Sequence, residues 1–262
     1  MSYGYSQRWR NLTIVVLRPL LFGLLKRDWR QRGNVPRTGG LIVAANHISE
    51  SDPLAIAHYV YGAGRYPVYL AKSGLFGKGF VGAVMRGTGQ ISVHRDHSDA
   101  VMALTEAEDA LAAGQCLMFY PEGTCTRDPD LWPMTGQTGA ARMALTTGAP
   151  VVPIASWGAH ELLPYRKGAK GGLAASLKPG FHPIPRKTMK VIAGPPVDLS
   201  AYQGRALDAE TLRAATADIM RAIADLVGEL RGERPPAELY DHHKAIEERR
   251  QASSDDKEAE TQ

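Results

Sequence analysis

Six short apolar runs separated by helical segments constrain the fold of this 262-residue chain more than any other feature. Each run has the length of a β-strand, and together they cover residues 41–45, 67–71, 90–94, 116–120, 151–155 and 190–193. Residues 98–113 and 139–147 have helical spacing and are each followed by a glycine. Strands that alternate with helices predict an α/β fold, with a mostly parallel or mixed central sheet flanked by helices.

The composition excludes several other classes of protein. Hydrophobic residues make up 44% and charged residues 22%, which is typical of a globular chain. Two cysteines cannot form a disulfide scaffold, and they favour a reducing compartment. The net charge of +4 is too small to predict nucleic-acid binding by itself. No apolar run approaches the ~20 residues of a membrane-spanning helix.

The first 40 residues carry an uneven charge. They hold eight basic residues and one acid, Asp28, which leaves +7. Two apolar runs, 12–17 and 20–25, are separated by Arg18 and Pro19. This pattern predicts a pair of helices within residues 1–33 that lies in the interface of an anionic membrane. The alternative is a helix packed on its own domain, with its arginines reaching outward.

The C-terminal part of the chain divides into a helix and a charged segment. Apolar residues recur at helical steps from Leu212 to Leu230, and Pro235 and Pro236 end the pattern. From residue 241 onward there are seven acids and four basic residues, with almost nothing apolar. We therefore expect a catalytic domain over residues 34–232 and a disordered tail over residues 233–262.

Polar residues follow three of the predicted strands. In largely parallel sheets, ligands bind beyond the carboxyl ends of the strands, so these residues are the candidates for a site. They are Asn46, His47 and Asp52 after the first strand, His94 and Arg95 after the third, and Glu122, Gly123, Thr124 and Arg127 after the fourth. No metal site is predicted, since histidines and cysteines lack ligand spacing outside His242 and His243.

His47 and Asp52 are the strongest candidates for catalysis. An apolar strand leads directly into His47, and Asp52 with Pro53 has the pattern of a helix start. A short loop lets the carboxylate fold back onto the imidazole, which raises the basicity of the other ring nitrogen, as a general base requires. The alternative is a surface histidine with a helix-capping aspartate. No nucleophile is evident. Cys125 is kept as an alternative candidate for a nucleophile.

Four segments resemble the four ordered blocks of the glycerolipid acyltransferases, a family that includes the bacterial 1-acyl-glycerol-3-phosphate acyltransferases. The segments are Asn46-His47 with Asp52, Gly87–Arg95, Phe119–Thr124 and Val151–Ile154, and the resemblance covers residues 34–197. It implies that His47 takes a proton from a glycerol hydroxyl as that hydroxyl attacks an acyl thioester, with Asp52 orienting the histidine. It implies no covalent acyl-enzyme.

The resemblance also implies the remaining site residues. Arg95 would hold the acceptor phosphate, Pro153 would shape the acyl-donor pocket, and the other substrate-binding residues would be Asn46, Glu122, Gly123, Thr124 and Arg127. The alternatives are a solvated charge for Arg95 and a turn carboxylate paired with Arg127 for Glu122.

The chain departs from the family at three positions. Cys125 follows Gly123-Thr124 where the family usually has arginine, and Thr135 and Gln137 stand where lysine or arginine is frequent. Phosphate binding would then fall to Arg95, Arg127 and, as further candidates, Lys72 or Arg142.

The expected function is transfer of a fatty acyl group from acyl-CoA or acyl-carrier protein to lysophosphatidate, giving phosphatidate. We expect a peripheral location at the cytoplasmic face of the cell membrane and no metal or other cofactor. Glycerol 3-phosphate or another lysolipid is an alternative acceptor. A thioesterase or lipid hydrolase, and a non-catalytic lipid-binding protein, are the alternatives from other classes.

Overall fold

A seven-stranded sheet forms the centre of the molecule. The computed structural model describes residues 3–93, 97–164, 181–242 and 244–247. The strands lie in the order β1-β7-β6-β2-β5-β3-β4, and all neighbours are parallel except β6 and β7. Their bounds are β1 Leu25–Arg30, β2 Leu41–Ala45, β3 Pro67–Lys72, β4 Ile91–Val93, β5 Cys116–Phe119, β6 Val151–Trp157 and β7 Lys187–Ala193. This sheet confirms the predicted α/β class with a mixed, mostly parallel sheet.

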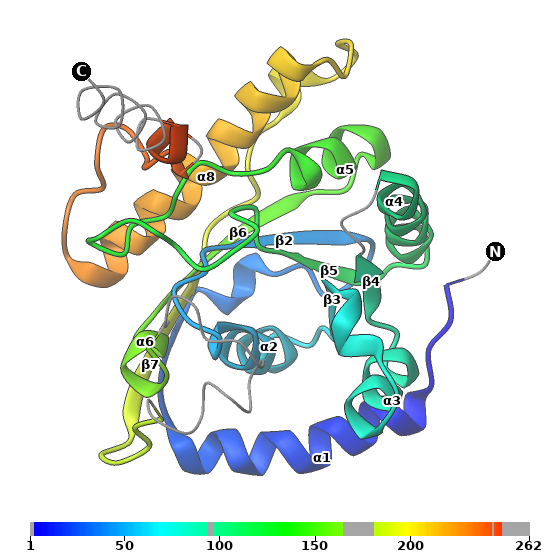
Figure 1. Cartoon of the computed structure of the whole chain (residues 1–262), viewed down its shortest axis with the longest axis vertical. Helices are drawn as coiled ribbons and strands as arrows, with labels where there is room; N and C mark the ends of the chain where they lie inside the picture. The colour runs from blue at the N-terminus through cyan, green and yellow to red at the C-terminus, as the bar shows by residue number, and fades with distance from the viewer. Residues whose placement is uncertain (1–2, 94–96, 165–180, 243, 248–262) are drawn as a thin grey trace, which may run out of the picture.

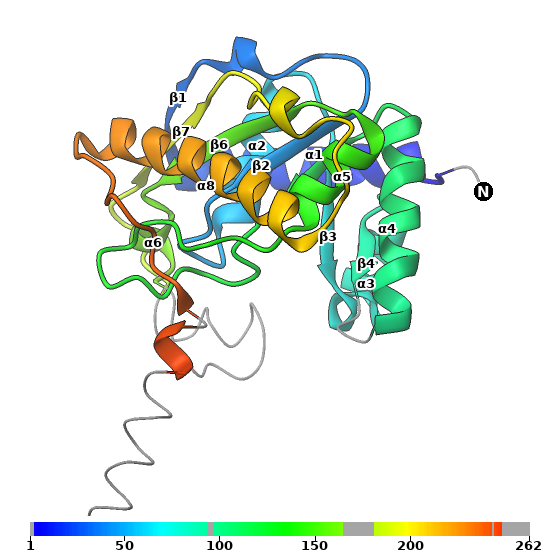
Figure 2. The ribbon, with the colours of Figure 1, turned by 90° about the horizontal axis from the view of Figure 1, so that it is seen from above.

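Helices cover both faces of the sheet (Figure 1). One face carries α4 (His97–Ala112), α5 (Gly139–Thr147) and α8 (Ala209–Arg231), and Figure 2 shows α8 crossing it diagonally. The other face carries α2 (Asp52–Gly62), with α1 (Gln7–Leu24) packed outside it. The remaining helices are α3 (Phe80–Gly87), α6 (Ala159–Leu162), η1 (Arg32–Asn34), η2 (Ser73–Phe76) and η3 (Ser200–Tyr202).

The apolar runs become strands because they are buried on both sides. All five residues of β2 are buried. Ile42 and Ala44 join the core beneath α4, α5 and α8, whereas Leu41, Val43 and Ala45 join the core beneath α2. A parallel strand with two covered faces reads as a continuous apolar run.

The N-terminal helix pair predicted from the sequence is instead one helix and one strand. Helix α1 continues through Pro19, and residues 25–30 form the edge strand β1, paired with β7. Burial of Leu21 and Leu25 against α2 and β7 holds the helix end in place despite the proline. Residues 1–33 therefore contribute a strand to the central sheet, while the expected domain boundaries stay predictions.

Arg10 anchors α1 to the rest of the fold. Its guanidinium carbon lies 3.4 Å from the centre of the Tyr5 ring and 4.3 Å from that of Tyr66. The same group donates hydrogen bonds to the Thr88 carbonyl (3.1 Å) and to Oε1 of Gln115 (3.0 Å). Because the side chain is buried, these contacts fix the rotation of α1 about its axis.

The first part of the predicted C-terminal tail contacts the domain. Arg221 donates to the carbonyl of Pro236, and the backbone N–H of Thr135 donates to the Tyr240 carbonyl at 3.0 Å. Met134 and Tyr240 also form an isolated bridge. Pro236 therefore contacts α8 and Tyr240 contacts the loop around residue 134, while residues 248–262 lie outside the described part.

Among the described residues, no helix has the length and apolar character needed to cross a membrane.

Replacing Arg10 with alanine tests the anchor of α1. The change leaves the Thr88 carbonyl and the Gln115 side chain without their donor inside the fold, so we expect the free energy of unfolding to fall by about 2 kcal/mol. Urea unfolding measures this. Arg8→Ala is the matched control, because Arg8 lies exposed on the same helix. Equal losses in the two variants would contradict the anchor.

Candidate active site

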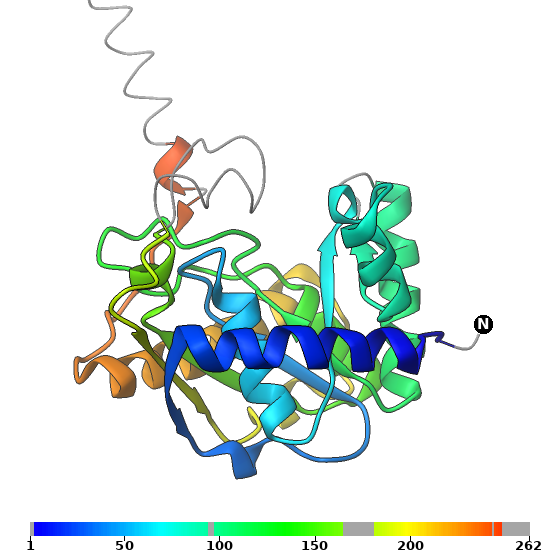
Figure 3. The same cartoon turned by 90° about the horizontal axis from the view of Figure 1, so that it is seen from below.

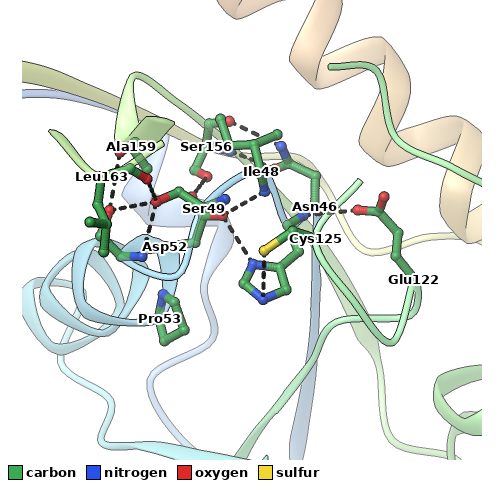
Figure 4. Close-up of polar contacts among 12 residues, drawn as sticks. Asn46, Ile48, Ser49, Asp52, Pro53, Glu122, Cys125, Ser156, Ala159 and Leu163 are labelled. Atoms are coloured by element: carbon green, nitrogen blue, oxygen red, sulfur yellow. Dashed lines mark hydrogen bonds and ion pairs between the residues drawn. The ribbon is translucent and has the colours of Figure 1, made fainter. Parts of the chain in front are cut away.

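The turn between β2 and α2 brings His47 and Asp52 together. Strand β2 ends at Ala45 and helix α2 begins at Asp52, with Pro53 in its first turn. The short turn returns the Asp52 carboxylate to the imidazole, so that Oδ2 lies 3.1 Å from Nδ1 of His47 (Figure 4). The predicted pairing of the two side chains is therefore present, and their catalytic roles stay predictions.

Asp52 is held by three further hydrogen bonds. Its Oδ2 accepts from the backbone N–H groups of Ile48 (2.6 Å) and Ser49 (2.7 Å), and its Oδ1 accepts from the Ser156 hydroxyl (2.9 Å). The residue is fully buried. An ionised carboxylate only accepts, so this contact favours the neutral imidazole tautomer that has its hydrogen on Nδ1 and its lone pair on Nε2.

Asn46 joins the ends of two strands. Its Nδ2 donates to the Ser156 carbonyl (3.1 Å), and its Oδ1 accepts from the Ser156 N–H (2.8 Å). The side chain is fully buried. Asn46 thus fixes the residue that precedes His47, and a direct contact with substrate stays a prediction.

Glu122 connects the turn after β5 to His47. Its Oε1 accepts from the His47 N–H (2.8 Å), and its Oε2 accepts from the Met134 N–H (3.0 Å). The residue is 6% exposed, and this burial raises the pKa of its carboxyl to about 8, although the two N–H groups oppose the rise. Gly123 completes the turn with a φ of 69°, which favours glycine.

The His47 ring lies between an aromatic ring and a thiol. It stacks on Tyr120 with ring centres 4.4 Å apart, and Sγ of Cys125 lies 3.5 Å from Nε2. The His47 carbonyl accepts from the Thr126 N–H at 2.7 Å. The side chain keeps 15% of its surface exposed, so the imidazole has limited access to solvent.

The imidazole of His47 therefore lies between the Cys125 thiol, next to Nε2, and the Asp52 carboxylate, next to Nδ1. Such an order of groups resembles the arrangement of an activated nucleophile. However, burial raises the pKa of the Cys125 thiol far above its usual range, and the Asp52 and Glu50 carboxylates add to the rise. The resting thiol is therefore protonated and occupies the space next to the Nε2 lone pair.

The other predicted site residues differ in how deeply they are buried, and two of them lie outside the described residues. Thr124 is half-buried and Gly123 exposed at the turn, and Arg127 is half-buried. Pro153 is buried within β6, in register with Ala44, and its role in a donor pocket stays a prediction. The predicted phosphate ligand Arg95 and its neighbour His94 lie outside the described residues. Of the further candidates, Lys72 is exposed and Arg142 half-buried.

Two neighbours of the central pair escaped the sequence analysis. Ser156 supports Asp52 and Tyr120 supports the His47 ring. Tyr120 directly follows β5 and Ser156 lies near the carboxyl end of β6, so both are close to the strand ends that the sequence analysis searched. Their partners are 104 and 73 residues away in the chain, however, and no local pattern predicts such pairings.

Within the described residues, no group of three or more histidine, cysteine, aspartate or glutamate side chains is arranged to hold a metal ion.

Comparison with known families defines the class of protein. The model of the Acyltransferase family matches residues 26–157, which include His47, Asp52 and Glu122. The chain therefore belongs to the Acyltransferase family.

Curated relatives agree with this assignment. The chain is 32% identical over 122 residues to a 1-acyl-sn-glycerol-3-phosphate acyltransferase of Borreliella burgdorferi, covering 46% of this chain and 47% of that protein. It is 27% identical over 146 residues to a chloroplastic 1-acyl-sn-glycerol-3-phosphate acyltransferase of Brassica napus, covering 55% and 41%. The matched regions thus span less than half of each relative.

A solved structure shares the fold. The 1-acyl-sn-glycerophosphate acyltransferase PlsC of Thermotoga maritima superposes with a TM-score of 0.59 and 23% identity, covering 84% of this chain and 79% of that one. This likeness supports the arrangement of the sheet and its helices.

The pH dependence of stability tests the buried state of Glu122. In the folded protein this carboxyl binds its proton up to about pH 8, whereas its ordinary pKa is 4.5. Folding therefore takes up a proton between these values, and the free energy of unfolding falls as the pH rises through them. Glu122→Gln has no such proton, so we expect the wild type to lose stability relative to this variant over the same range.

Urea unfolding at several pH values gives this difference. Glu50→Gln is the control, since Glu50 is exposed in the neighbouring turn and should follow the wild type. A Glu122→Gln profile parallel to that of the wild type would show that the carboxyl is not buried as described.

Proposed function

We propose that this protein transfers a fatty acyl group from a thioester, acyl-CoA or acyl-carrier protein, to the free hydroxyl of lysophosphatidate, giving phosphatidate. The observation that carries the proposal is the contact between Nδ1 of His47 and the buried Asp52 carboxylate, which favours the tautomer with its lone pair on Nε2. The names of the relatives support the choice of lysophosphatidate.

The reaction then needs one base and close placement of two substrates. Nε2 of His47 takes the proton of the acceptor hydroxyl as its oxygen attacks the thioester carbonyl carbon. The carbon–sulfur bond breaks, and the leaving thiolate receives the proton from His47. Asp52 stabilises the imidazolium that exists between these two transfers. The thioester is already activated, so the proposed route calls for no prosthetic group.

Binding of the acceptor phosphate is the second part of the proposal. Arginine binds phosphate through two parallel hydrogen bonds, which suits Arg95 and Arg127. The backbone at Gly123 is in the left-handed conformation, and such a turn can direct the N–H groups of Gly123 and Thr124 at an anion. Glu122, whose two oxygens accept from His47 and Met134, would act by positioning His47.

A membrane surface is the proposed partner, because the acceptor is a lipid. The basic N-terminal segment supports this proposal, and a location at the cytoplasmic face stays a prediction.

Replacement of the base tests the reaction. We expect His47→Ala to lower acyl transfer from palmitoyl-CoA to lysophosphatidate in mixed micelles by about a hundredfold or more. Asp52→Asn should lower turnover by a similar factor with little change in substrate binding, because an amide does not stabilise the imidazolium. Phosphatidate formation is the measurement, and the melting temperature of each variant shows whether it is folded.

Further measurements in this assay distinguish the acyltransferase from a hydrolase and from a binding protein. Release of free fatty acid without acceptor would identify a hydrolase. Binding of palmitoyl-CoA with no turnover on lysophosphatidate, glycerol 3-phosphate or a carrier-protein donor would identify a binding protein. Equal transfer by wild type and His47→Ala would remove His47 from the mechanism.

Cys125 distinguishes direct transfer from a covalent route. Its protonated thiol is not the nucleophile in the proposed mechanism, so Cys125→Ala should change transfer by less than about tenfold, whereas removing a nucleophile from a triad costs about 10⁶. Intact-protein mass spectrometry after incubation with palmitoyl-CoA alone should show no acyl adduct. Cys116→Ala is the matched variant, since Cys116 lies in β5 within the core. An adduct that disappears only in Cys125→Ala would establish an acyl-enzyme.

A further inference from the structure

We propose that η2 and α3 form a second lipid-contacting element beside α1, so that one continuous surface of both elements docks the protein on an anionic membrane. The proposal rests on the proposed function, because it names where a membrane supplying the acceptor would touch the protein. The α1–α3 surface consists of the outward side chains of α1, η2 and α3.

The outward face of α1 is apolar. A helix packed on one side ordinarily carries polar residues on its other side. Here Leu21 and Arg10 face the protein, yet Val15 is 70% exposed and the exposed face also holds Leu12, Val16 and Leu20. The helix therefore has apolar side chains on both its inner and outer faces, and the outer ones lack a partner in the described structure.

The short helix α3 presents the same kind of side chain. Phe80 is 70% exposed and Val81 is 60% exposed at its start, and Leu75 is exposed in η2. Large apolar residues so exposed and so close together mark an interaction surface rather than ordinary scatter. The turn before α3 is tight, because a Cβ at Gly82 would clash with the Gly77 carbonyl oxygen. The backbone that carries Phe80 and Val81 is therefore compact.

Helices α1 and α3 contact each other. Trp9 of α1 and Phe80 of α3 have ring centres 6.2 Å apart, and a Cβ at Gly87 would lie 2.4 Å from the Trp9 ring. Figure 3 shows α1 across the front of the molecule, with α3 on the same side near the N-terminal end of α1. The Arg10 anchor fixes α1 in this relation, since Thr88 directly follows α3.

The charge of these elements indicates which partner binds the α1–α3 surface. Besides the buried Arg10, residues 7–24 and 73–87 hold the basic residues Arg8, Arg18, Lys78 and Arg86, and they hold no acid. A second copy of the chain docked face to face would bring like charges together, which disfavours a symmetric dimer. An anionic lipid surface accepts both the apolar side chains and the cations.

This arrangement places the membrane next to the segment that leads to Arg95. Helix α3 ends at Gly87, and β4 begins at Ile91, so only residues 88–90 separate the docking element from the strand.

Vesicle flotation tests the second element. We expect Phe80→Glu with Val81→Glu to weaken binding to phosphatidylglycerol-containing vesicles at least about tenfold, since burial of these side chains in lipid is lost and two anions are added. Val15→Glu with Val16→Glu should weaken it similarly. The control is Leu207→Glu, an exposed apolar position two residues before α8, which is the helix that covers the opposite face of the sheet (Figure 1); this variant should bind as the wild type does. Removal of residues 1–33 is unsuitable, because it would delete β1 and Arg10.

The outcomes separate this proposal from the proposed function. Weak vesicle binding by the α3 variant, with transfer in detergent micelles and melting temperature close to wild type, supports the α1–α3 surface whatever acceptor is used. Binding unchanged in the α3 variant but lost in the α1 variant would overturn the role of α3. A wild-type dimer that dissociates in the α3 variant, with no vesicle binding by either protein, would show that the surface contacts a second copy.

Discussion

The carboxylate of Asp52 accepts hydrogen bonds from the His47 ring, from two backbone N–H groups of the preceding turn and from the Ser156 hydroxyl. A buried carboxylate is costly unless its oxygens are fully bonded, and here the bonds come from both the β2–α2 turn and β6. The folding of the sheet and the orientation of the His47 ring therefore depend on the same group. Asn46 reinforces this dependence by tying the end of β2 to Ser156 through two more hydrogen bonds.

A second set of contacts reaches His47 from the C-terminal side. Glu122 holds the His47 backbone and the Met134 backbone at once, and Met134 in turn pairs with Tyr240. His47 is thus fixed on its side chain by Asp52 and on its main chain by Glu122. General-base catalysis requires this kind of placement, because a small displacement of the imidazole costs far more rate than it costs binding.

Local sequence patterns predicted the structural features that depend on residues close together in the chain. The strand 41–45 and the helix 139–147 have the bounds expected from their apolar spacing, and the return of Asp52 to His47 follows from a short turn before a proline. Strand β1 was not foreseen, since its sequence is polar and its place at the sheet edge comes only from pairing with β7. The continuation of α1 through Pro19 depends on distant packing in the same way. Glu122 was expected to touch substrate, but its backbone partners carry no sequence signal.

The parallel pairing of β1 with β7 has a consequence for how the chain is made. Leu25 lies beside Lys187, so β1 gains its neighbouring strand only after synthesis has reached residues 187–192. At a synthesis rate of ~5–20 residues per second, this interval is on the order of ten seconds. During that time the outward apolar side chains of α1 stay uncovered, and β1 has no strand beside it. The segment that is exposed in the finished protein is thus also available to lipid or to a chaperone before the sheet is complete.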